Sequence, residues 1–147
     1  MADRVGRAWR ALRTIAALRV DCAQAEHRRT VLAERDAEHA LAAADSALID
    51  AADAWQRQVR ERFDPALGGA YARVLTARSE AQTSAAETRR AAARATEAAA
   101  ETTRREQARN EAVATQADAA VRKARSHADE RALMAITDRA ALKWIQR

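Results

Sequence analysis

The sequence predicts an all-α fold, a long antiparallel two-helix coiled-coil hairpin, and three observations support it. Ala and Arg dominate the 147 residues, which include one Pro, three Gly and five aromatic residues. Charged residues make up 32%, and a chain rich in Ala, Arg, Glu and Leu with helical periodicity is typical of a long helix or coiled coil. Helix-breaking residues cluster only once, in the segment 64–69. We therefore expect a single domain over residues 1–147, made of two helices.

The first helix is expected over residues 3–63, because its apolar residues recur every three or four positions. Asp3 is a suitable N-cap, and Glu34 interrupts the pattern once. No Pro or Gly interrupts residues 7–63. The apolar stripe comprises Val5, Trp9, Leu12, Ala16, Val20, Ala23, His27, Val31, Ala37, Leu41, Ala44, Leu48, Ala52, Trp55, Val59 and Phe63.

The turn is expected at residues 64–69 and the second helix at residues 70–146. Pro65 lacks a backbone donor, and Gly68 and Gly69 permit positive φ, so this segment allows the chain to reverse. A short turn favours antiparallel neighbours. With the turn centred near residue 67, residue 5 faces residue 129, and residues 130–147 extend past the first helix. This overhang is apolar and either stays exposed for a partner or is covered by a bend in the hairpin.

Large side chains gather at the two ends of the predicted hairpin. Trp55, Phe63 and Tyr71 lie near the turn, whereas Trp9 and Trp144 lie near the chain termini. Between them, residues 77–112 offer little larger than Ala at apolar positions. Small side chains let helices approach closely but contribute little hydrophobic free energy. We expect a close-packed Ala seam of modest stability.

Motifs of catalysis and of cofactor or metal binding are missing from the sequence. Gly68-Gly69 lacks the Lys and Ser/Thr of a phosphate-binding loop, and Cys22 has no second Cys. The three His residues are scattered, and Ser126 next to His127 lies on a helix without a pocket. We therefore expect no enzyme activity, cofactor or metal.

The charge pattern and hydropathy limit the other classes of partner. The net charge is +5, yet Arg alternates with Glu along most of the chain, as on a solvated helix face, so no specific nucleic-acid binding is expected. No apolar run is long enough for a transmembrane segment. Residues 1–20 form a weaker candidate for a membrane-surface helix. No secretory signal is recognisable, and we expect a cytoplasmic protein.

Two local sequences resemble a known family. Gly68-Gly69-Ala70-Tyr71 followed by Val74-Leu75 looks like the entry into the second helix of the flagellar export protein FliJ and its type III secretion counterparts, the SctO/YscO stalk proteins. The run 128–133, which contains Asp129-Glu130-Arg131, is similar to the C-terminal helix of that family. The chain is richer in Ala and poorer in Gln and Lys than flagellar members, which favours a secretion-system homologue.

The resemblance implies a non-catalytic stalk that couples a hexameric secretion ATPase to the export gate, peripheral to the inner-membrane export apparatus. Export chaperones are further partners in this interpretation, and the protein alone would be a monomer. The ATPase-facing residues would be Trp9, Arg10, Arg13, Arg131, Leu133, Met134, Arg139 and Trp144. The gate-facing residues at the tip would be Trp55, Val59, Phe63, Tyr71, Val74 and Leu75.

Two alternatives remain open from the sequence. The chain could be a generic coiled-coil adaptor, scaffold or export chaperone that binds another helical protein through its tip. It could also be an obligate homodimer forming a four-helix bundle, because an Ala seam buries little apolar surface.

Overall fold

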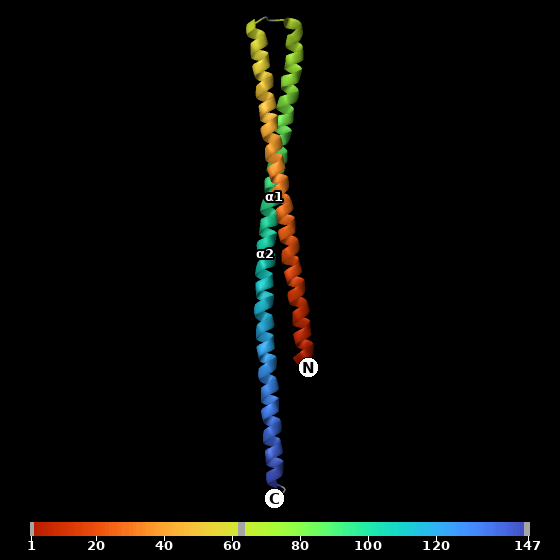
Figure 1. The fold of residues 1–147 in the computed structure, drawn as a ribbon, viewed down its shortest axis with the longest axis vertical. Coiled ribbons are helices and arrows are strands. Elements are labelled where there is room, and N and C mark those ends of the chain that lie inside the picture. The colour runs from red at the N-terminus through yellow and green to blue at the C-terminus, as the bar shows by residue number, and fades with distance from the viewer. Residues whose placement is uncertain (1, 62–63, 146–147) are drawn as a thin grey trace. The chain divides into compact units, whose positions relative to one another are not determined.

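The computed structural model describes residues 2–61 and 64–145, with side chains for residues 6–61 and 64–140. It contains helix α1, Ala2–Glu61, and helix α2, Pro65–Ile145, and the described residues include no strand (Figure 1). The all-α helical hairpin predicted from the sequence is confirmed. Contacts divide the chain into two units. We call Met1–Ala23 with Thr102–Arg147 the terminal unit, and Gln24–Glu101 the tip unit.

Both helices are long because almost nothing in their sequences opposes helix formation. Ala has the highest helix propensity, and Arg and Glu follow closely. Thr is less favourable, but exposed Thr hydroxyls donate to the carbonyl four residues earlier, as Thr14 does to Arg10 and Thr137 to Leu133. Such bonds satisfy the hydroxyl within the helix. The helices therefore extend over 60 and 81 residues.

Helix α2 begins five residues earlier than the sequence pattern suggested, because Asp64 caps it. The Asp64 carboxylate accepts a hydrogen bond from Ala66 N at 2.8 Å, and its carbonyl accepts from Leu67 N at 3.1 Å and Gly68 N at 3.2 Å. Pro65 is the first helical residue, where its missing donor costs nothing and its fixed φ suits the helix. Gly68 and Gly69 are helical and neither has positive φ. The expected turn at 64–69 is therefore wrong for residues 65–69.

Replacing Gly68 by alanine is expected to stabilise the tip unit, by about 0.5–1 kcal/mol, because Gly disfavours a helix interior. A Cβ atom there would lie 3.7 Å from Trp55 Cη2, an ordinary van der Waals distance. At Gly69 the added atom would lie 3.8 Å from the flexible Arg73 guanidinium. Urea denaturation followed by circular dichroism measures the free energy of unfolding of Gly68→Ala and Gly69→Ala. A loss of stability in both variants would contradict the helical assignment.

Replacing Asp64 by alanine is expected to destabilise the start of α2 by about 1 kcal/mol, because the N-cap acceptor is lost. Asp64→Asn should retain most of the stability, since the amide oxygen can accept the same bond from Ala66 N. Hydrogen exchange at residues 66–69 reports the change locally. Equal protection in Asp64→Ala and the unaltered chain would show that this cap is not used.

The buried positions between the helices hold small side chains in each unit. Ala117 in the terminal unit is 2% exposed, and Ala37 in the tip unit is 7% exposed. Thr103 is the buried polar residue of the terminal unit. Among the described side chains, no large one is fully buried. Larger residues of the tip unit, such as Leu41 and Leu48, are only half-buried, so the helices bury little apolar surface per residue.

One ion pair in each unit records the antiparallel register of the helices. In the terminal unit, Arg13 Nη1 lies 3.2 Å from Asp118 Oδ1. In the tip unit, Arg89 Nη2 lies 3.7 Å from Glu38 Oε1. All four side chains are about half exposed, so each pair stabilises the fold by no more than about 1 kcal/mol. Ala2 lies eleven residues before Arg13, and Asp129 lies eleven residues after Asp118. The Arg13–Asp118 pair therefore places Ala2 and Asp129 at the same level along the two helices.

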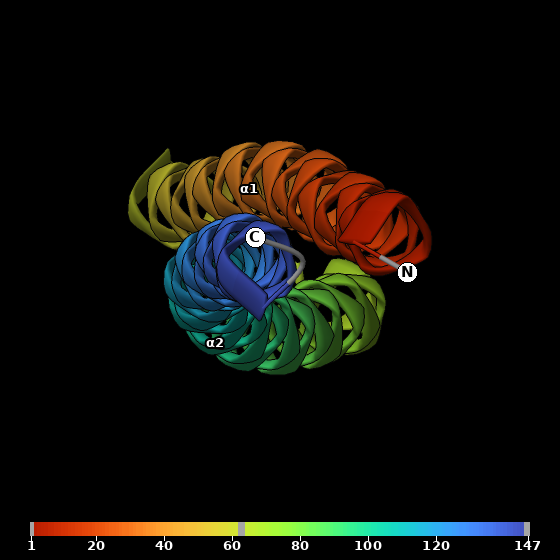
Figure 2. The ribbon, with the colours of Figure 1, turned by 90° about the horizontal axis from the view of Figure 1, so that it is seen from below.

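Within the terminal unit, α2 continues past the start of α1, as the blue and red ends of the chain show (Figure 1). Seen from below, the start of α1 and the end of α2 are separate helices (Figure 2). Ala128 is half-buried, whereas every residue from 129 to 140 is exposed. We call α2 from Asp129 onward the overhang. Its described part matches the uncovered alternative that the sequence left open.

Candidate partner-binding surfaces

The overhang presents large apolar side chains to solvent. Leu133, Ile136 and Met134 are 62–67% exposed. Leu133 and Met134 line a shallow hollow of about 390 Å³ together with Thr137, Glu130 and Asp138. Two apolar side chains between two carboxylates suit a partner surface that is apolar and basic. Leu133 and Met134 were predicted as site residues from the sequence, whereas Ile136, Glu130 and Asp138 were not.

The other described residues expected at the ATPase end do not line this hollow. Trp9 is half-buried. Arg13 is paired with Asp118, and Arg10 Nε donates to the Gly6 carbonyl at 3.3 Å. Arg131 Nε donates to the His127 carbonyl at 3.1 Å, while Arg139 is exposed. The side chain of Trp144 lies outside the described residues.

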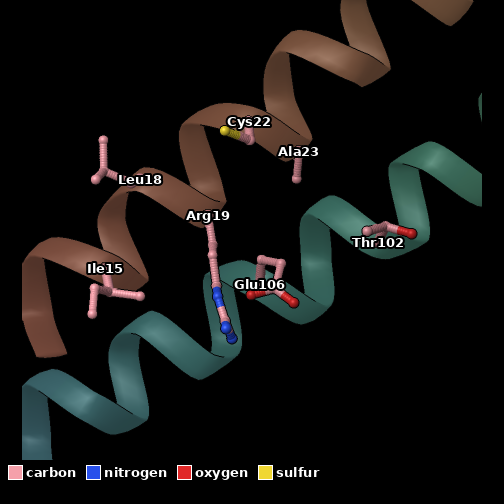
Figure 3. Close-up of a pocket in the computed structure, with 7 residues that line it drawn as sticks. All are labelled: Ile15, Leu18, Arg19, Cys22, Ala23, Thr102 and Glu106. Atoms are coloured by element: carbon pink, nitrogen blue, oxygen red, sulfur yellow. The ribbon is translucent and has the colours of Figure 1, made fainter.

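A second apolar surface of the terminal unit lies beside the helix seam and was not singled out from the sequence. It is an open groove of about 480 Å³, lined by α1 residues Ile15, Leu18, Arg19, Cys22 and Ala23 and by α2 residues Thr102 and Glu106. Figure 3 shows the Arg19 side chain reaching toward α2 near Glu106, while Leu18 points away from α2. Leu12, which the sequence pattern assigned to the seam, is 48% exposed. The periodic pattern therefore misplaced Leu12.

The tip unit brings two of the expected tip residues into direct contact. The rings of Trp55 and Tyr71 have centroids 5.2 Å apart, with planes tilted by 43°. Both side chains are half-buried, as is Leu75. Val59 and Val74 are 43% and 47% exposed. Phe63 lies outside the described residues. The described part of the predicted tip surface thus combines an aromatic pair with exposed valines.

The polar residues near the start of the overhang share one carboxylate. Ser126 Oγ donates to Glu130 Oε1 at 3.2 Å, and His127 Nδ1 lies 3.3 Å from Glu130 Oε2. All three side chains are exposed. A hydrolytic triad needs a hydroxyl that is hydrogen-bonded to the histidine that activates it. Here the Ser126 hydroxyl and the His127 ring both contact the Glu130 carboxylate. This cluster has the contacts of a helix surface.

The described residues contain no group of three or more His, Cys, Asp and Glu side chains arranged to hold a metal ion. No stretch of the described helices combines the length and hydropathy that a bilayer span requires.

Comparison of the chain with protein-family models, curated proteins and solved structures gave no match.

Proposed function

We propose that the protein is a non-catalytic stalk that couples a hexameric secretion ATPase to the export gate of a type III secretion apparatus. The observation that carries the proposal is the overhang, where Leu133, Met134 and Ile136 are exposed on a helix that α1 no longer accompanies. A helix that continues alone past its partner is suited to enter a ring of subunits. The family resemblance of the segments 68–75 and 128–133 supports the same interpretation.

In this proposal, the terminal unit acts by binding the ATPase subunits unequally. The overhang has different faces, since Leu133 and Met134 lie beside Glu130 and Asp138. Subunits around the helix would meet apolar groups on one side and other groups elsewhere. A ligand changes a conformational equilibrium only through its different affinities for the states. Unequal contacts would therefore favour different nucleotide states in different subunits.

The tip unit is assigned to the export gate, because it combines exposed large apolar groups with a pair of aromatic residues. Val59 and Val74 are exposed near the Trp55–Tyr71 pair. Aromatic rings with apolar neighbours are common anchors in protein interfaces. Binding of the gate's cytoplasmic region to the full chain, and its loss in Val59→Asp with Val74→Asp, tests this assignment.

The decisive experiment mixes the purified chain with the type III secretion ATPase of the same organism and measures binding and ATP turnover. We expect binding and altered turnover, and at least a tenfold weaker affinity, about 1.4 kcal/mol, for the variant Leu133→Glu with Met134→Glu. The matched control is Ile49→Glu, which changes a similarly exposed apolar residue of the tip unit. Absence of binding and of any effect at saturation would refute the stalk proposal.

A generic coiled-coil adaptor is the second candidate, and the groove along Ile15 and Leu18 favours it. An apolar groove beside two helices is a common docking place for an amphipathic helix. This candidate requires no ATPase. It is supported if Ile15→Glu abolishes binding of a helical partner while the ATPase experiment gives no effect.

A further inference from the structure

Helix α1 of the terminal unit carries a second apolar stripe, separate from the seam. Its members are spaced alternately by three and four residues, which is the heptad pattern of a coiled-coil seam. All of them are exposed. This outer stripe consists of Ala8, Ala11, Ile15, Leu18 and Cys22.

The outer stripe lies beside a groove that α1 and α2 both line, and is suited to receive another helix. Figure 3 shows Leu18 and Cys22 on the side of α1 that is turned from α2, next to the groove. Ile15 is 50% exposed and Leu18 is 57% exposed. A heptad stripe is typically covered by a helix, since alternating spacing presents knobs and holes along one line. A helix lying in this groove would contact α1 and α2 together.

The overhang has the length and the chemistry of that missing helix. From Asp129 to the end of α2 it extends for about 25 Å, and the outer stripe from Ala8 to Cys22 covers about 22 Å. It also exposes large apolar groups that nothing in the described terminal unit covers, Leu133 and Met134 among them. It cannot fold back onto its own α1, because it continues the same helix beyond Ala2.

Charged side chains of opposite sign lie beside the two apolar surfaces. Residues 2–23 contain five Arg and two Asp, and Arg19 lines the groove itself. Residues 129–145 contain three acidic and three basic residues, and the two acids Glu130 and Asp138 flank the apolar hollow. Arginine beside an apolar groove thus meets carboxylates beside an apolar helix. Opposite charges at the rim of an apolar contact favour one pairing over others.

We propose that two copies of this chain form a symmetric dimer in which the overhang of each lies along the outer stripe of the other. In one copy, Ala2 and Asp129 lie at the same level, so the overhang extends in one direction from that level and the outer stripe in the other. A second copy turned end for end therefore places its overhang along the outer stripe of the first copy and its outer stripe along the overhang of the first copy. Each contact repeats the other, as a two-fold interface requires. The protein alone is then a dimer, in place of the monomer expected from the family resemblance. In the dimer, the surface assigned to the ATPase is covered.

The same surfaces fit an anionic membrane less well. The stripe offers arginines, but Glu106 lines its groove, and Glu130 and Asp138 lie beside the apolar groups of the overhang. Carboxylates next to the inserted groups oppose binding to negatively charged lipid. A second copy uses both apolar surfaces, whereas a membrane uses only the stripe.

Analytical ultracentrifugation of the full chain measures the dimer directly, without any secretion component. We expect the mass to rise from 16.1 kDa to twice that value as the concentration is raised to about 100 µM. The outer-stripe variant, Ile15→Glu with Leu18→Glu, should weaken association at least tenfold, and so should the overhang variant, Leu133→Glu with Met134→Glu. The control, Leu32→Glu with Ile49→Glu, changes exposed residues of the tip unit and should dimerise normally.

Mixing the two defective variants distinguishes this dimer from any other. Each variant alone lacks both contacts, but a mixed pair retains one, formed by the intact overhang of the first and the intact stripe of the second. The mixture should therefore associate measurably more tightly than either variant alone. A mass of 16.1 kDa at every concentration, unchanged association in both variants, or binding to anionic vesicles without dimerisation would each overturn the proposal. A failure here leaves the ATPase experiment unaffected.

Discussion

Replacing Ala117 by glutamate is expected to destabilise the terminal unit by about 3 kcal/mol, the largest effect of any single substitution considered. Ala117 is 2% exposed and lies in the seam between the helices. A longer side chain there must either separate the helices, which removes their van der Waals contacts, or take its carboxylate out of water. The larger apolar neighbours along α2, Val113 and Val121, are only half-buried, so little other apolar surface remains to hold the helices together.

The matched control for Ala117→Glu is Ala119→Glu, two residues away on an exposed face of the same helix. It introduces the same charge with a similar loss of helix propensity, so its cost should stay below about 0.5 kcal/mol. Hydrogen exchange at residues 103–121 follows the terminal unit, and urea denaturation follows the whole chain. Equal effects of the two substitutions would show that helix propensity, and not the seam, sets the stability of this unit.

The extents of the helices follow closely from the sequence, and the single large error comes from Pro65. The periodic pattern placed the first helix at 3–63 and the second at 70–146, and the described bounds are Ala2–Glu61 and Pro65–Ile145. Pro and Gly are compatible with a turn, but Pro is equally suited to the first position of a helix. The Asp64 cap decides between them. Asp followed by Pro was the signal available in the sequence.

The apolar surfaces were harder to predict, because Ala is common on every face of α1. A stripe through Trp9, Ala16 and Val20 and a stripe through Ile15 and Leu18 both have helical spacing. Periodicity shows that a stripe exists but does not show which of two neighbouring stripes contacts α2. Ile15 and Leu18 are exposed, whereas Trp9, Ala16 and Val20 are half-buried.

The overhang was predictable because its start depends on the number of residues on each side of the turn and not on side-chain packing. A turn near residue 67 placed residue 129 opposite the start of the first helix, and exposure becomes continuous at Asp129. The hollow beside Leu133 and Met134 was not predictable in the same way. It depends on how Glu130 and Asp138 are arranged around the helix, and a charged pair in an Arg- and Glu-rich sequence carries little signal.

Replacing Trp55 by alanine is expected to destabilise the tip unit by about 2 kcal/mol. The indole packs against the Tyr71 ring, with 5.2 Å between the ring centroids, and lies beside Gly68. Truncation therefore leaves a gap that small neighbours cannot fill. Part of the loss belongs to the ring pair itself, since tilted aromatic pairs contribute about 1 kcal/mol beyond their buried area.

A double-mutant cycle isolates that contribution. Trp55→Ala, Tyr71→Ala and the combined variant should show a coupling free energy of about 1 kcal/mol by urea denaturation. Ile49→Ala is the control, because Ile49 is 61% exposed in the same unit and its truncation should change the free energy of unfolding by less than about 0.5 kcal/mol. Strict additivity of the two aromatic substitutions would mean that each ring packs only against its own helix. In that case the two arms of the tip unit would depend on the Ala seam around Ala37 alone.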